Sequence, residues 1–207
     1  MARISSTDEL RRILPEPRPT TRAKILDALD DQSIQFLARC PFALIGTVGA
    51  DGTVEVSPKG DDPGFIRVED PGTLLIPERA GNNLAFGLNN ILATGKIGLI
   101  GLVPATGETL RVSGTAEIHD DPDLLASLSS LGKPALLATR VRIQHCYFHC
   151  ARSVVRAKLW QPSAWPEPGR VSFGRIIAPR VGAGADVAAQ IDASVESAYT
   201  TRLWQNS

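Results

Sequence analysis

The sequence predicts a mainly β protein, an antiparallel barrel with helices at its periphery. Short apolar stretches follow one another through the middle of the chain, and strong turn pairs such as Asp51-Gly52 and Pro71-Gly72 separate neighbouring stretches. Only short helical patterns lie between them, whereas parallel strands need long crossover connections. A succession of hairpins therefore favours an antiparallel barrel over a parallel sheet of alternating strands and helices.

The N-terminal part is expected to form a helical extension. Ser6, followed three residues later by Glu9, has the form of a capping box and predicts a short helix that ends before Pro15. After an extended proline-rich link, apolar residues recur at roughly helical spacing in 20–29 and 31–39. This spacing predicts a helix-turn-helix pair whose apolar face packs on the main body.

The middle of the chain contains the predicted strands. Alternating or continuous apolar residues indicate strands, and these are expected at 42–48, 53–57, 65–69, 73–76, 96–103, 108–118 and 141–150. Helices are predicted at 84–93 and 122–130, the second with Asp121 as N-cap and Pro122 in the first turn.

The chain is predicted to be one domain with two appendages. The helical extension occupies residues 1–40, the barrel 41–160, and a strap and helix that pack on the same domain 161–207. In the last part, residues 162–170 are rich in Pro and Trp, and 185–203 have a mildly apolar helical stripe. Such a stripe is typical of a helix that docks on its own domain or on a partner subunit.

Composition excludes several function classes. Lys plus Arg and Asp plus Glu both number 22, so no net charge attracts nucleic acid or an anionic membrane. The charged N-terminus lacks the apolar core of a signal peptide, and no apolar run reaches the ~20 residues of a membrane span. We therefore expect a cytoplasmic protein, and the odd number of cysteines, 3, suits a reducing compartment.

Polar residues gather where two predicted strands end. One strand runs into Ser57, Pro58 and Lys59, and the other runs toward Arg79. Gly81 then allows a sharp turn into the next helix. A helix N-terminus has free backbone N–H groups, so these cations, together with the amide side chains that follow Gly81, are candidates for an anion site. The alternative is that they are ordinary turn residues and solvated cations.

Two further groups of polar residues are candidates for ligand binding. His145, Cys146, His149 and Cys150 offer four metal ligands, but strand alternation places the histidines and the cysteines on opposite faces. We therefore predict no metal site. Arg111 lies on the strand 108–118 and is expected to face the turn at residues 82–83, where it would add a second cation for a phosphate.

Five motifs in order carry a resemblance to a known family. They are S-P-K-G-D at 57–61, L-I-P-E-R-A-G-N-N at 75–83 before a helix, G-K-I-G-L-I at 95–100, G-E-T-L-R-V-S-G-T-A at 107–116, and F-H-C with R-A-K-L-W at 148–160. On these motifs, which span about half of the chain, it resembles the pyridoxamine 5′-phosphate oxidase-like family. The resemblance is closest to the branch with an N-terminal helical extension and a C-terminal helix.

The resemblance implies an FMN-binding split β-barrel and a homodimer with FMN in a groove between subunits. The implied cofactor-binding residues are Ser57, Pro58, Lys59, Ile76, Pro77, Arg79, Asn82, Asn83, Arg111 and Trp160. Lys59 would lie near the reactive edge of the flavin, where it is the candidate catalytic residue. Arg79 and Arg111, with the two asparagines, would hold the phosphate, and Trp160 would approach from the partner subunit.

One departure from the family pattern bears on function. Members often have basic residues in the turn after the glycine, whereas Asn83 and Leu84 stand here. The sequence-based hypothesis is an FMN-dependent oxidoreductase with a small-molecule substrate that the sequence does not identify. Two alternatives stay open: a non-catalytic module that binds or senses flavin or haem, and a dimeric interaction protein with an empty site.

Overall fold

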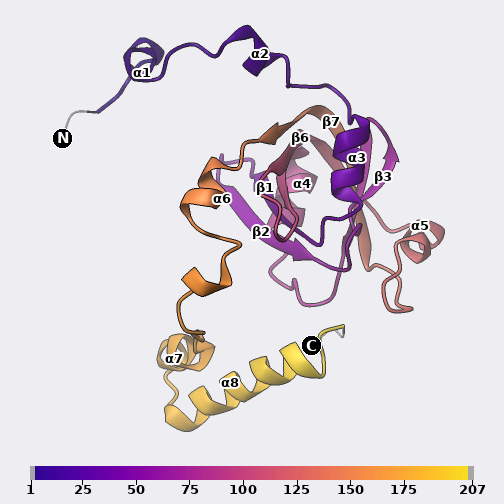
Figure 1. The fold of residues 1–207 in the computed structure, drawn as a ribbon. Coiled ribbons are helices and arrows are strands. Elements are labelled where there is room, and N and C mark those ends of the chain that lie inside the picture. The colour runs from indigo at the N-terminus through magenta and orange to yellow at the C-terminus, as the bar shows by residue number, and fades with distance from the viewer. Residues whose placement is uncertain (1–2, 205–207) are drawn as a thin grey trace.

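The structure, a computed structural model, describes residues 3–204 and contains one antiparallel sheet. Its strands are β1 Phe42–Val48, β2 Val54–Gly60, β3 Arg67–Asp70, β4 Thr73–Glu78, β5 Lys96–Leu102, β6 Thr109–His119 and β7 Leu137–His149. They lie in the order β2-β1-β5-β6-β7-β4-β3, and every neighbouring pair is antiparallel. The predicted class, mainly β with peripheral helices, is confirmed (Figure 1).

The sheet curls so that its two ends face each other. In the strand order, β2 and β4 are separated by four strands, yet Lys59 on β2 pairs with Glu78 on β4. Ile45 of β1, Ile76 of β4 and Val141 of β7 also belong to one buried cluster. The strands therefore enclose a single apolar core, which is the split-barrel arrangement.

Two prolines that we expected in turns lie inside strands. Pro58 belongs to β2, which is an edge strand paired only with β1. Pro77 belongs to β4 beyond Leu75, the last residue of β4 that pairs with β3. In both places one side of the strand has no partner, so the missing N–H of proline breaks no ladder hydrogen bond. Both strands therefore extend further than the sequence predicted.

The N-terminal extension matches the prediction in part. Helix α1, Thr7–Ile13, begins at Ser6, whose side chain accepts from the Glu9 backbone N–H. The helix expected at 20–29 is only one turn, α2 Pro19–Arg22. The chain then runs along β7, where Leu26 and Cys146 exchange two backbone hydrogen bonds. Strand β4 has already ended its pairing with β7 at that level, so the bridge satisfies backbone groups that would otherwise stay unpaired.

Three helices complete the barrel. Helix α3, Asp31–Leu37, buries Phe36 and Leu37 against the core. Helix α4, Phe86–Thr94, packs against β1 and β6. Helix α5, Pro122–Ser127, has Asp121 as its N-cap and Pro122 in its first turn, as predicted.

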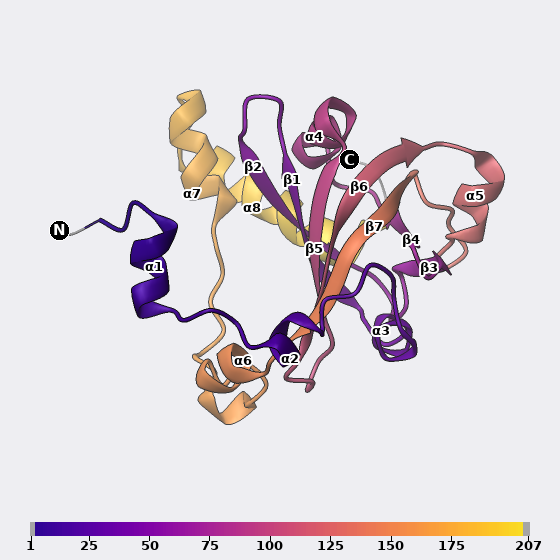
Figure 2. The ribbon, with the colours of Figure 1, turned by 90° about the horizontal axis from the view of Figure 1, so that it is seen from above.

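The C-terminal part extends beyond the barrel and returns to it at the end of α8 (Figures 1 and 2). It contains α6 Arg152–Arg156, η1 Pro162–Ala164, α7 Phe173–Ile177, η2 Ala178–Val181 and α8 Ala185–Thr200. Asp192 on α8 accepts hydrogen bonds from the Ser172 hydroxyl and the Gly174 backbone N–H, which joins α7 to α8. Helix α8 buries none of its residues. In the described part of the chain, no helix has the length and apolar character to cross a membrane.

Candidate functional site

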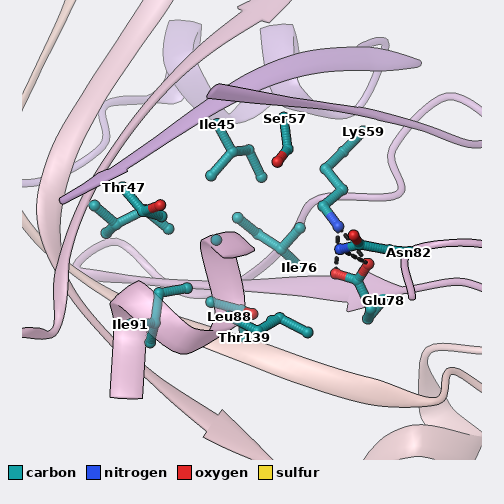
Figure 3. Close-up of a pocket in the computed structure, with 12 residues that line it drawn as sticks. Ile45, Thr47, Ser57, Lys59, Ile76, Glu78, Asn82, Leu88, Ile91 and Thr139 are labelled. Atoms are coloured by element: carbon teal, nitrogen blue, oxygen red, sulfur yellow. Dashed lines mark hydrogen bonds and ion pairs between the residues drawn. The ribbon is translucent and has the colours of Figure 1, made fainter. Parts of the chain in front are cut away.

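A small niche lies inside the barrel where β1, β2 and β4 approach α4 (Figure 3). It has about 20 Å³ of room, which is about enough for one water molecule. Most of the side chains around it are apolar, and the lining residues are Ile45, Thr47, Ser57, Lys59, Ile76, Glu78, Asn82, Gly87, Leu88, Ile91, Ile97 and Thr139. The niche is therefore an apolar cavity with polar groups placed on its wall.

Lys59, Glu78 and Asn82 form the polar end of the niche (Figure 3). The Lys59 ammonium pairs with both carboxylate oxygens of Glu78. Asn82 Nδ2 donates to Glu78 Oε1 over 3.0 Å. Glu78 is only 7% exposed, so these partners, rather than water, must stabilise its negative charge. Alternation along β2 turns Ser57 and Lys59 inward and leaves Pro58 exposed.

A wider groove continues from the polar end of the niche to the surface. It shares Ser57, Lys59, Glu78 and Asn82 with the niche, and its volume is about 550 Å³. The other residues that line it are Pro58, Gly60, Asp61, Phe65, Pro77, Arg79, Ala80, Gly81, Tyr199 and Leu203. One wall therefore comes from the end of α8 and the turn after it.

Arg79 is fixed in the groove on several sides. Its Nε donates to Asp61 Oδ2 over 2.7 Å, and its Nη2 donates to the Leu128 carbonyl over 2.8 Å. The Trp204 ring lies 5.9 Å from the guanidinium carbon, within the range of a cation–π contact. The buried Nη1 has no hydrogen-bond partner among the described residues. Arg79 thus has donor capacity to spare for an anion.

Each cation at the site is paired with a carboxylate. Lys59 pairs with Glu78, and Arg79 pairs with Asp61, whose side chain is almost fully buried and also accepts from the Ser130 hydroxyl. The four charges sum to zero. A ligand anion therefore meets hydrogen-bond donors here, but no net positive field.

The comparisons with known proteins identify the family. The family described as Pyridoxamine 5′-phosphate oxidase matches residues 29–150. The chain belongs to this family. The match starts before α3 and ends after β7, so it includes every strand of the barrel and leaves out α1, α2 and the C-terminal helices.

Solved structures and curated proteins complete the comparison. HupZ of Group A Streptococcus is 19% identical, with 58% of this chain and 94% of that one covered and a TM-score of 0.47. A general stress protein 26 relative from Clostridium acetobutylicum is 15% identical, with 57% and 86% covered and a TM-score of 0.45. A protein named F420 reductase is 20% identical, with 57% and 98% covered and a TM-score of 0.42. No curated protein matches the chain.

The structure brings together most of the residues that the resemblance to the oxidase family implied. Ser57, Lys59, Ile76 and Asn82 line the niche, and Pro58, Pro77 and Arg79 line the groove. Asn83 is exposed in the turn before α4, and the neighbouring Leu84 is exposed too. Gly81 adopts a φ of 107°, as the expected sharp turn requires. The role of these residues in binding a cofactor stays a prediction.

Arg111 does not face the turn at residues 82–83 of its own chain, so this expectation is wrong for a single subunit. Leu110 and Val112 are buried in the core, so alternation turns the intervening Arg111 outward. Its Nη1 lies 3.1 Å from His149 Nε2, and its guanidinium carbon lies 5.7 Å from the Tyr147 ring centroid. Burial lowers the pKa of His149, and the positive charges of Arg111 and Lys24 lower it further.

Trp160 also lies outside the groove of its own chain. Its Nε1 donates to the Thr106 carbonyl over 2.7 Å, in the connection between β5 and β6. Its predicted approach to a flavin therefore requires a second subunit.

On strand β7 the histidines and Cys146 lie on opposite faces, which is the arrangement on which we based the prediction of no metal site. The rings of His145, Tyr147 and His149 stack along one face, while Cys146 is buried on the other. Within residues 3–204 no group of His, Cys, Asp and Glu side chains is placed to hold a metal ion.

Sequence reasoning missed two residues of the site. Glu78 and Asp61 each belong to a motif of the family resemblance, but neither received a role. Acidic side chains are usually solvated, and the sequence offers no local signal that these two are buried. The only available indication was their position beside Arg79 and Lys59 in the two motifs.

Proposed function

We propose that this member of the oxidase family binds FMN in the groove, beside the niche, and acts as an oxidoreductase on a small molecule. One observation supports this most strongly. An apolar niche inside the barrel has a buried Lys59–Glu78 pair at its mouth and opens into a groove where Arg79 has an unpartnered donor. This combination offers apolar walls for a planar ring, a cation at the ring edge and a donor for a phosphate.

The residues present fit FMN. The groove, with about 550 Å³ of room, can take FMN, whereas the niche, with about 20 Å³, takes no more than a water-sized group beside the ring. Arg79 Nη1, which has no hydrogen-bond partner among the described residues, would donate to the phosphate, and the first turn of α4 after its N-cap Ala85 would add backbone N–H donors. Asn82 and Asn83 would complete the phosphate contacts. They supply hydrogen bonds without charge, so we expect weaker phosphate binding than basic residues would give.

FMN, when bound, supplies the hydride or electron transfer. The proposed part of the protein is to place and polarise it. Lys59 would donate a hydrogen bond at the reactive edge, and Glu78 would keep the ammonium oriented. Ser57 is a second donor beside Lys59, while Ile76 and Pro77 would flank the ring through their backbone. Packing of the ring against the groove wall would exclude water from one of its faces.

We also propose that the protein is a homodimer with a shared groove. The outer face of β1 and β2 exposes Phe42, Leu44, Val54 and Val56, a cluster typical of a subunit interface. A second subunit would also give Arg111 and Trp160 a route to the flavin. Sedimentation velocity at micromolar concentration tests this, with a dimer expected and a monomer contradicting it. Arg111→Ala should then weaken FMN binding if its cation reaches the partner's groove.

The decisive experiment is the visible absorption spectrum of the purified protein, before and after FMN is added and the sample desalted. We expect retained flavin. A protein that does not bind FMN contradicts the proposal and favours the alternative hypothesis of a dimeric interaction protein. Retained flavin that neither NADH nor NADPH reduces would favour the non-catalytic flavin module, and retained haem in place of flavin would favour the haem module.

The substitution Arg79→Ala tests where the FMN phosphate binds. Arg79→Ala removes a charge-assisted hydrogen bond of roughly 1.5–3 kcal/mol, so FMN affinity should fall by about tenfold to 150-fold. The matched control is Arg67→Ala, on β3, whose guanidinium bonds Ser127 outside the niche and the groove. Unchanged affinity in Arg79→Ala would show that the phosphate lies elsewhere.

A further inference from the structure

We infer that the groove selects an uncharged, planar, apolar substrate and that Tyr199 and Leu203 form the wall in contact with it. The inference rests on the proposed function, because it assumes that the flavin occupies the inner part of the groove, beside the niche. It concerns the C-terminal turn after α8, which lies outside the residues that match the family.

The end of α8 is anchored at the groove. Trp204 lies against the Arg79 guanidinium, and Lys133 Nζ donates to the Trp204 carbonyl over 3.1 Å. Tyr199 and Leu203 line the groove opposite β2 and β4, yet they are 59% and 57% exposed. Two large apolar side chains held at the mouth of a groove offer unburied surface to a ligand.

The charges at the groove argue against an anionic substrate. Lys59 is already paired with Glu78, and Arg79 with Asp61. The one unpartnered donor, Arg79 Nη1, is the group that we assign to the FMN phosphate. A second phosphate or carboxylate would therefore find two carboxylates and no available cation among the described lining residues, and burying an unpaired charge is costly.

The remaining walls suit a flat apolar molecule. Pro58, Phe65 and Pro77 line the groove beside Tyr199 and Leu203. The groove has about 550 Å³ of room, within the range of roughly 300–1,000 Å³ that is usual for one ligand, and its mouth is open to the surface. The substrate would therefore lie at this open mouth, between the flavin and the α8 wall.

The test compares two probes of the same shape, 2-naphthamide and 2-naphthoate, which differ in charge. Their binding to the FMN-loaded protein is measured by titration calorimetry. We expect the neutral amide to bind at least about tenfold more tightly, which corresponds to about 1.4 kcal/mol. Equal or tighter binding of the carboxylate would overturn the inference.

Substitutions in the wall give the second readout. Tyr199→Ala and Leu203→Ala should each weaken 2-naphthamide binding several-fold while FMN retention stays at the level of the unsubstituted protein. Trp165→Ala is the matched control, because Trp165 is similarly exposed, at 56%, and lies outside the groove. Unchanged amide binding in both wall variants would overturn the inference. These side chains are exposed, so the variants should fold, which circular dichroism checks.

The outcomes separate the two proposals. A protein that retains no FMN contradicts the proposed function, and the same titration on the flavin-free chain still tests the wall and its preference for the neutral probe. A protein that retains FMN but binds the two probes equally contradicts only the substrate class.

Discussion

The barrel and the C-terminal helix pair both contain a glycine in close contact with another backbone, but the two glycines lie in different surroundings. A Cβ on Gly114 of β6 would lie 1.9 Å from the Arg142 carbonyl oxygen, and one on Gly174 of α7 would lie 1.9 Å from the Ala188 carbonyl oxygen. Gly114 is buried in β6, whose inward side chains Leu110 and Val112 belong to the core, whereas α8 buries no residue. The same local contact should therefore affect global stability very differently in the two regions.

The largest effect is expected from Gly114→Ala. The new methyl group would overlap the Arg142 carbonyl at the irregular pairing of β6 with β7, so the two strands must separate. We expect the free energy of unfolding to fall by about 4 kcal/mol, at the upper end for point substitutions. Urea denaturation measures this. A loss below about 1 kcal/mol would mean that the barrel accommodates the methyl group easily.

Glu78→Ala should have the next largest effect. It leaves the Lys59 ammonium without its carboxylate in a largely buried position, and removing one partner of a buried pair costs about 3–5 kcal/mol. Because Lys59 keeps some exposure, we expect the lower end, about 3 kcal/mol, by urea denaturation. The double variant Lys59→Met with Glu78→Leu should recover most of this stability. No recovery would show that Glu78 acts through contacts other than Lys59.

A pair of helix caps compares the barrel with the N-terminal extension. Asp30 caps α3, which packs on the core, and Ser6 caps α1, which buries no residue. Asp30→Ala should lower the free energy of unfolding by about 1 kcal/mol at pH 7. Ser6→Ala should change it by less than about 0.3 kcal/mol, because α1 can unfold without the barrel. Equal effects would show that α1 unfolds together with the barrel.

The Asp30 effect should depend on pH. Hydrogen bonds from the Ser33 side chain and backbone lower the pKa of Asp30 in the folded state. A carboxyl group with a lowered folded pKa contributes stability above its unfolded pKa, and this contribution disappears as pH falls through the folded pKa. The difference between the native protein and Asp30→Ala should therefore shrink below about pH 4. A difference that stays constant from pH 7 to pH 3 would contradict this.

Gly174→Ala should have the smallest effect on the barrel. The methyl group would separate α7 from α8. The free energy of unfolding of the barrel should nevertheless change by less than about 0.5 kcal/mol. Hydrogen exchange should instead become faster in residues 172–200. A loss of stability comparable to that of Gly114→Ala would show that the C-terminal helices and the barrel unfold as one unit.

Much of the barrel was predictable because strands and caps depend on local pattern. The strand at 42–48 and the turn at Asp51-Gly52 match β1 and the hairpin that follows it. Asp121 and Ser6 cap the helices that they were expected to cap. The extra length of β2 and the shortness of α2 were not predictable, since both depend on which strand edges have partners. Those partners are distant in sequence.

For the candidate site, sequence alone supplied the residue types and their approximate places at the ends of two strands. It determined that Lys59 and Arg79 follow strand-forming stretches, and that Gly81 turns the chain into α4. Only the tertiary structure decided their partners. Curling of the sheet brings β2 and β4 together across four intervening strands, so Lys59 meets Glu78. Register likewise decided that Arg111 points outward, because a shift of one residue moves a strand side chain to the opposite face.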